Sequence, residues 1–78
     1  MRQISAKLKD IEAASLFITL NREQDFEIDV KVGRYLIDGK SVLGIVGMAV
    51  GADIIISLIT DDERLAEEYC RKLGKILS

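Results

Sequence analysis

Residues 38–59 of this 78-residue chain read DGKSVLGIVGMAVGADIIISLI, and the interpretation of this stretch decides the fold. From position 42 to position 59 the only ionisable side chain is Asp53, so a membrane-spanning helix has to be considered. Such a helix needs about 20 apolar residues and loses roughly 2.5–3.5 kcal/mol to a central Asp. Glycines weaken the helix further, and residues 51–53 are typical of a turn. We therefore predict a short helix, a turn and a strand at 53–59 rather than a membrane span. The β-branched composition of this strand favours a central, buried place in a sheet.

The segments before this stretch predict strands and one long helix. Apolar and polar residues alternate at positions 3–9 and 26–32, a pattern that is typical of strands with one buried face. After the second of these strands, Gly33-Arg34 indicates a tight turn into a short antiparallel strand at 35–37. Asp10 suits a helix N-cap. The helix after Asp10 is expected to reach about Asn21 and to bury a face formed by Ala13, Leu16, Phe17 and Leu20.

The C-terminal residues predict a capped amphipathic helix. Thr60 and Glu63 have the spacing of a capping box, in which each side chain satisfies a free backbone amide of the other. Acid–base pairs at spacing i, i+4, Glu67 with Arg71 and Glu68 with Lys72, are expected on the outward face. The inward face is expected to hold Leu65, Ala66, Tyr69, Cys70, Leu73, Ile76 and Leu77.

The resulting order is strand–helix–strand–strand–helix–strand–helix over one domain, residues 1–78. Helices segregated on one face of an antiparallel sheet form an α+β open-faced sandwich. We expect a four-stranded sheet with a short middle helix that starts near Ser41 and ends by Gly51. A chain of this length buries only roughly 60–65% of its unfolded surface and has no room for a second domain or a deep cleft.

Composition excludes several classes of function. The formal charge is −2, from 11 basic and 13 acidic residues, and no basic run exceeds two residues, so nucleic-acid binding is not expected. The chain has no histidine, and its one cysteine, Cys70, is interpreted as a small core residue. We therefore predict no disulfide, no metal site and no cofactor. The first ten residues, MRQISAKLKD, lack the apolar region of a signal peptide, which favours the cytoplasm.

The run Lys40-Ser41-Val42-Leu43-Gly44-Ile45-Val46 resembles the segment around the regulatory serine of HPr, the small phosphocarrier of the sugar phosphotransferase system. Downstream, Gly51-Ala52-Asp53-Ile54 is similar to the Gly-Ala-Glu-Ile with which that family enters its last strand. The predicted order of elements is also the HPr order, although motif identity is confined to about residues 33–56. The resemblance therefore implies the HPr-like fold.

The phosphocarrier motif of HPr, Ile-His-Ala-Arg-Pro, is replaced here by Ile11-Glu12-Ala13-Ala14-Ser15. Glu12 takes the histidine position, Ala14 the arginine position and Ser15 the proline position. A phosphocarrier needs a nucleophile that holds a labile phosphoryl group, so the resemblance predicts that a histidine carrier site, and enzymatic activity with it, is absent. Glu12 is interpreted as a favourable acid in the first turn of a helix. Mimicry of phosphohistidine by Glu12, and a carrier role for Glu12 or Ser15, remain as alternatives.

Ser41 has two interpretations. Its hydroxyl suits a helix N-cap, which alone explains a serine at this position. The resemblance adds that Ser41 is a regulatory phosphorylation site, where a phosphate would bring about two negative charges next to Lys40.

The middle helix is expected to leave part of its apolar surface exposed. Ile45, Met48 and Ala49 can face the sheet, so Val42, Leu43 and Val46 remain on the other side. With Lys40, these three residues are predicted to dock a protein partner, which the resemblance suggests is a phosphotransferase-system component, a serine kinase or a transcription regulator. Alternatively, the patch packs under a neighbouring loop or in a homodimer, and a homodimer could also form through Ile55 and Ile59.

Overall fold

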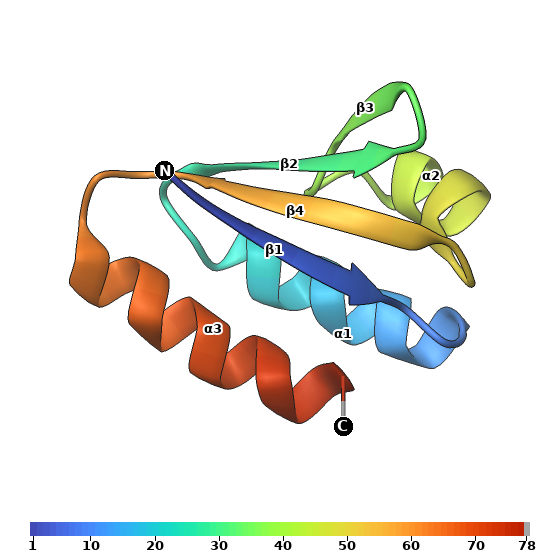
Figure 1. Ribbon diagram of the computed structural model, residues 1–78. Helices are drawn as coiled ribbons and strands as arrows, with labels where there is room; N and C mark the ends of the chain where they lie inside the picture. The colour runs from blue at the N-terminus through green and yellow to red at the C-terminus, as the bar shows by residue number, and fades with distance from the viewer. Residues whose placement is uncertain (78) are drawn as a thin grey trace.

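The computed structural model describes residues 1–77, which form a four-stranded antiparallel sheet covered by helices on one face (Figure 1). This architecture confirms the predicted α+β open-faced sandwich and its order of elements. Along the chain the elements are β1 (Arg2–Lys7), α1 (Ile11–Arg22), β2 (Glu27–Val32), β3 (Tyr35–Asp38), α2 (Val42–Gly44), the π-helical segment η1 (Ile45–Ala49), β4 (Asp53–Ile59) and α3 (Glu63–Leu77).

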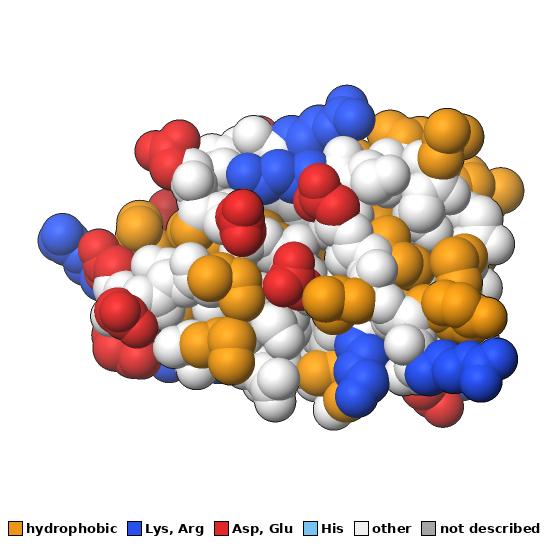
Figure 2. Space-filling view, turned by 90° about the horizontal axis from the view of Figure 1, so that it is seen from above, with side chains coloured by type: hydrophobic (Ala, Val, Ile, Leu, Met, Phe, Trp, Pro, Cys, Tyr) orange, Lys and Arg blue, Asp and Glu red, His pale blue; other side chains and the backbone are white. Residues whose placement is uncertain are grey.

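The strand order is β1-β4-β2-β3, so the β-branched strand β4 lies between β1 and β2, as its composition predicted. Ile56 of β4 is paired with Ile4 on one side and Val30 on the other. The alternating side chains Ile55 and Ile59 lie on the open face, where each is 38% exposed. Figure 2 looks onto this open face and shows acidic side chains near its middle. The sheet therefore has one apolar, helix-covered face and one open face that carries both charged and aliphatic side chains.

Helix α1 buries three of the four residues predicted for its inward face, Ala13, Phe17 and Leu20, but not the fourth. Its N-cap is Asp10, as expected, because the carboxylate accepts a 2.8 Å hydrogen bond from the amide of Ala13. Leu16, however, is 52% exposed, so its assignment to the core was wrong. The buried face turns instead toward Ile18 and Asn21, and Asn21 is 0% exposed. The sequence pattern does not predict the burial of Asn21, because asparagine is mostly exposed in folded proteins. The buried residues of α1 are Ala13, Ala14, Phe17, Ile18, Leu20 and Asn21.

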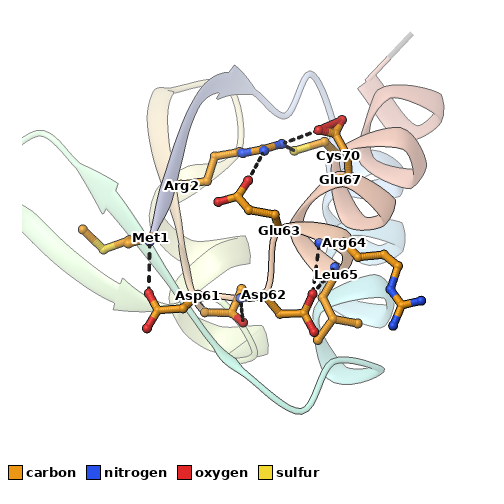
Figure 3. Close-up of polar contacts among 10 residues, drawn as sticks. Met1, Arg2, Asp61, Asp62, Glu63, Arg64, Leu65, Glu67 and Cys70 are labelled. Carbon is orange, nitrogen blue, oxygen red and sulfur yellow. Dashed lines mark hydrogen bonds and ion pairs between the residues drawn. The ribbon is translucent and has the colours of Figure 1, made fainter.

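Helix α3 is capped by Asp62 rather than by the predicted box. The amides of Arg64 and Leu65 donate to Oδ1 of Asp62 at 3.0 and 3.2 Å, while the Thr60 hydroxyl accepts from the amide of Asp62. Glu63 turns away from this cap and pairs with Arg2 (Figure 3). The capping-box prediction was wrong because two acceptors lie two residues apart and the loop geometry selects the second.

Arg2 of β1 holds the first turns of α3 against the sheet. Its guanidinium lies 2.8 Å from Glu63 and 3.4 Å from Glu67, and it donates to Sγ of Cys70 at 3.6 Å (Figure 3). The hydrogen bond to Cys70, followed by those to the two acids, raises the pKa of Arg2. Glu67 therefore pairs with Arg2 of β1, whereas the sequence predicted a pair with Arg71.

Of the other predictions for α3, the second ion pair and the burial of Tyr69 are confirmed, and the burial of Leu65 is wrong. The Glu68–Lys72 pair is present at 3.4 Å, and Tyr69 is buried with its ring edge-to-face against Phe26, 6.3 Å between centroids. Leu65 is 41% exposed, which corrects its predicted place on the inward face. No helix within residues 1–77 has the length and apolar character that crossing a membrane requires.

Candidate functional site

Ser41 stands where β3 gives way to α2, and it caps the helix as predicted. Its backbone is extended, and its hydroxyl oxygen accepts a 3.2 Å hydrogen bond from the amide of Gly44. The carbonyl of Ser41 accepts a second bond, 3.0 Å, from the amide of Ile45. The hydroxyl and the carbonyl of Ser41 therefore both satisfy backbone amides in the first turn of the helix. Ser41 itself is half-buried.

The helix that begins after Ser41 is less regular than expected. Three α-helical residues give way at Ile45 to a five-residue π-helical segment. Segments of this kind are rare and recur at functional sites. Gly44 allows the helix to approach β3, because a Cβ atom at this position would overlap the side chain of Ile37. The position of this segment is thus set by close packing rather than by helix-forming residues.

Three aliphatic side chains project outward from this segment, and we call them the aliphatic surface: Val42, Leu43 and Val46. They are 44%, 87% and 38% exposed, respectively, as the sequence predicted. Ile45 and Ala49 are 0% exposed and anchor the segment in the core. Figure 2 shows hydrophobic side chains gathered at the end of the molecule where α2 lies.

Met48 was predicted to face the sheet, but it is 42% exposed. The π-helical segment has more residues per turn than an α-helix, so Met48 rotates out of line with Ile45 and Ala49. Helix α1, which packs against η1, carries further exposed apolar side chains at Ile11 and Leu16. The sequence analysis did not predict these two exposed residues. It placed Leu16 on the buried face of the helix and gave no position for Ile11.

Lys40 is bound to the end of α1 instead of extending into solvent. Its ammonium donates to the carbonyl of Gln24 at 2.8 Å, and its amide donates to the carboxylate of Asp38 at 2.9 Å. Its carbonyl accepts from Nε of Arg22 at 3.1 Å. The residue before Ser41 is therefore held by both its backbone and its side chain.

The start of α1 places Glu12, which the sequence resemblance aligns with the HPr histidine, in an exposed first turn. A shallow hollow of about 260 Å³ is lined by Glu12 together with Asp10, Lys9 and Lys75. Ala14, which the sequence resemblance aligns with the HPr arginine, is 0% exposed and belongs to the core. The sequence analysis did not predict that Lys9 and Lys75 would lie near Glu12. Lys75 comes from the last turn of α3, far from Glu12 in the sequence. The hollow thus combines carboxylates with ammonium groups and offers no nitrogen nucleophile of the imidazole type.

No protein-family model and no curated protein sequence matches the chain. Among solved structures, HPr-C-His from Thermoanaerobacter tengcongensis has 24% sequence identity and a TM-score of 0.75, covering 99% of this chain and 91% of that one. The phosphocarrier protein HPr from Bacillus anthracis has 20% identity and a TM-score of 0.71, with coverages of 99% and 96%. The histidine-containing phosphocarrier protein of Mycoplasma has 16% identity and a TM-score of 0.72, with coverages of 96% and 90%. The strand order, the helix that starts at Ser41 and these likenesses together show that the chain has the HPr-like fold.

Proposed function

We propose that this chain is a non-enzymatic interaction module related to HPr of the phosphoenolpyruvate-dependent sugar phosphotransferase system. In this proposal it presents the aliphatic surface and Ser41 to a protein partner. The observation that carries the proposal is the exposure of Val42, Leu43 and Val46 on a segment whose inward residues are fully buried. Aliphatic side chains gathered on a surface mark interaction sites more often than they serve folding.

The departure at the start of α1 supports a regulatory role over a carrier role. Two of the solved structures similar in fold are named phosphocarrier proteins, and one of these two is described as histidine-containing. This chain contains no histidine, and Ala14 fills the core where the family has its arginine. The segment around Ser41 is where the sequence itself resembles HPr, so we assign the function to residues 42–49, which we call the Ser41 helix.

The first test uses two aspartate substitutions with matched exposure. Val46 and Ile55 are each 38% exposed, but Val46 belongs to the aliphatic surface and Ile55 to the open face of the sheet. Val46→Asp is expected to weaken binding of an HPr-type serine kinase, measured by calorimetry, by at least about tenfold, whereas Ile55→Asp leaves it unchanged. Urea unfolding controls for stability. An unfolded Val46→Asp variant would place Val46 in the core, and equal binding by both variants would contradict the proposal.

Ser41 is the proposed site of regulation. Phosphorylation would put about two negative charges beside the aliphatic surface and change which partners can dock. Incubation with an HPr-type serine kinase and ATP is expected to add about 80 Da to the chain but not to Ser41→Ala. Intact mass spectrometry reads the result. Absence of the heavier species in the unmodified chain would remove this part of the proposal.

The hollow at Glu12 keeps a second function open, namely a phosphoryl carrier. Lys9 and Lys75 line the same hollow and supply positive charge near the Glu12 carboxylate, where an acyl phosphate would form. A hydroxylamine-sensitive label at Glu12 after incubation with enzyme I and phosphoenolpyruvate would establish this function. The same experiment covers Ser15, whose phosphate ester would resist hydroxylamine.

The third candidate is a homodimer formed through the open face of the sheet. Ile55 and Ile59 are exposed on this face four residues apart on β4, and Leu36 of β3 lies on the same face. Light scattering coupled to size exclusion would give the mass of the species in solution. A dimer that Ile55→Asp dissociates would favour this role over docking through the aliphatic surface.

A further inference from the structure

Asn21 is the one buried polar residue among residues 1–77, and its amide joins three parts of the fold. Its Nδ2 donates to the carbonyl of Gly39 at 2.7 Å. Its Oδ1 accepts from the hydroxyl of Tyr69 at 2.5 Å. Asn21 therefore connects α1 both to α3 and to the residues that lead into Ser41. A buried amide costs free energy unless it is hydrogen-bonded, so these two bonds hold its position closely.

Gly39 is fixed from both sides by this arrangement. Its amide donates to the carbonyl of Ile28 in β2 at 2.7 Å, and its carbonyl accepts from Asn21. A Cβ atom at Gly39 would lie 2.8 Å from both the side chain and the carbonyl oxygen of Ile28, and 3.1 Å from Nδ2 of Asn21. Glycine is thus required at this position because the chain passes between a strand and a helix.

Two further hydrogen bonds hold the next residue in place. Arg22 donates to the carbonyl of Lys40, and the ammonium of Lys40 donates to the carbonyl of Gln24. The first of these bonds is exposed and the second is partly buried, so water competes with both. The bonds of Asn21 are buried, so they are the ones that water cannot replace.

The Ser41 helix cannot hold this position by itself. Its eight residues, of which two are glycines and five are π-helical, fall short of the length at which isolated helices form. Its orientation must therefore come from its anchors, which are the buried Ile45 and Ala49 below and the Gly39–Lys40 backbone at its start.

We infer that Asn21 is a positioning residue that sets where Ser41 and the aliphatic surface stand, and that the Tyr69 hydroxyl orients the Asn21 amide for this task. The inference rests on the proposed function of the Ser41 helix. It adds that α3, which carries none of the surface residues, takes part in displaying them. Loss of either side-chain bond should loosen residues 39–45 more than the rest of the fold.

Three near-isosteric variants test the inference. Tyr69→Phe removes the hydroxyl, and Asn21→Leu removes the amide. Thr19→Val is the matched control, because it removes a hydroxyl that donates to the carbonyl of Ser15 on the exposed side of the same helix. Hydrogen exchange of the Gly44 and Ile45 amides reports on the Ser41 cap, and β4 amides report on global unfolding.

Tyr69→Phe and Asn21→Leu are expected to speed exchange at Gly44 and Ile45 about tenfold more than in β4, whereas Thr19→Val changes neither. Equal acceleration in both places would overturn the inference. If Asn21→Leu does not fold, Tyr69→Phe still decides, since its hydrophobic contacts are retained. Hydrogen exchange of the unmodified chain is a separate test. Its Gly39 amide should exchange as slowly as the β4 amides, and exchange of that amide at the intrinsic rate would also overturn the inference.

Kinase assays separate this inference from the function on which it rests. If the unmodified chain is phosphorylated at Ser41, Tyr69→Phe should raise KM several-fold and leave kcat nearly unchanged, because the serine is displaced rather than altered. An unchanged KM would contradict positioning. If the unmodified chain is not phosphorylated, the proposed regulation fails, and hydrogen exchange alone decides the role of Asn21.

Discussion

The two capped helix starts, Asp10 at α1 and Ser41 at α2, look alike locally but lead into helices that are held in place differently. The cap of α1 leads into a 12-residue helix with six buried residues. The cap of α2 leads into eight residues of which two, Ile45 and Ala49, are buried. Helix α1 is therefore held by its own packing, whereas the Ser41 helix is held by its neighbours.

This difference shows that the residues that stabilise the fold and the residues that are exposed to a partner lie mostly on different helices. Most apolar residues of α1, including Ala14, are buried in the core. The apolar residues of the Ser41 helix remain mostly outside, so folding does not account for them. Substitutions along the two helices should therefore differ in their cost to stability.

The largest effect is expected in the core at Phe17, which is 0% exposed. Phe17→Ala should lower the free energy of unfolding by about 3–5 kcal/mol, through lost burial and a cavity between α1 and the sheet. Urea unfolding measures the change. Leu16→Ala, on the exposed side of the same helix, is the control and should cost less than about 1 kcal/mol. Similar losses at both positions would mean that the buried face of α1 has been assigned incorrectly.

The next effect concerns the contact between α2 and β3. Gly44→Ala should cost about 1–3 kcal/mol, because the added methyl group overlaps Ile37 and one of the two elements must shift. Gly47→Ala adds its methyl group in open space and should leave stability unchanged or raise it by up to about 1 kcal/mol. Chemical denaturation of the two variants compares them directly. A neutral Gly44→Ala would show that the approach of α2 to β3 is not tight.

A smaller effect should appear at high pH through Tyr69. Burial raises the pKa of Tyr69, so the folded chain keeps its proton where the unfolded chain loses it. The contribution of the protonated Tyr69 to the free energy of unfolding is therefore fully present below about pH 10. Above that pH the free energy of unfolding falls by up to about 1.4 kcal/mol per pH unit. Unfolding measured from pH 8 to 11 should show a steeper fall for the unmodified chain than for Tyr69→Phe. Parallel curves would contradict a buried hydroxyl.

The smallest effect is expected at Leu43, which is 87% exposed. Leu43→Ala should change the free energy of unfolding by no more than about 0.5 kcal/mol, since little contact is lost. Thermal and urea unfolding are both suitable. A loss near that of Phe17→Ala would remove the contrast between the two helices.

Local chemistry made much of this fold predictable from sequence. Asp10 and Ser41 cap their helices because a side-chain oxygen reaches amides within three residues, which depends on little beyond the chain nearby. The strand at 53–59 was recognised as central because its run of aliphatic residues suits burial between neighbours. The exposure of the aliphatic surface could be predicted from the limited face that a short helix can bury.

The errors arose where distant residues decide the outcome. Asn21 is buried with its amide hydrogen-bonded to Tyr69, 48 positions later, and Leu16 on the same helix is exposed. Arg2 likewise draws Glu63 and Glu67 away from the local partners that their spacing suggested. Met48 is exposed because of the π-helical segment, for which helical periodicity gives no signal.

The central claim is that the Ser41 helix is the working surface of this chain and that the start of α1 carries no phosphoryl group. The most direct measurement offers the chain to both phosphoryl donors in parallel, enzyme I with phosphoenolpyruvate and an HPr-type serine kinase with ATP, and locates the added mass by fragment sequencing. We predict one phosphoryl group on Ser41 from the kinase and none from enzyme I. A phosphoryl group on Glu12 from enzyme I, together with an unmodified Ser41, would contradict the account.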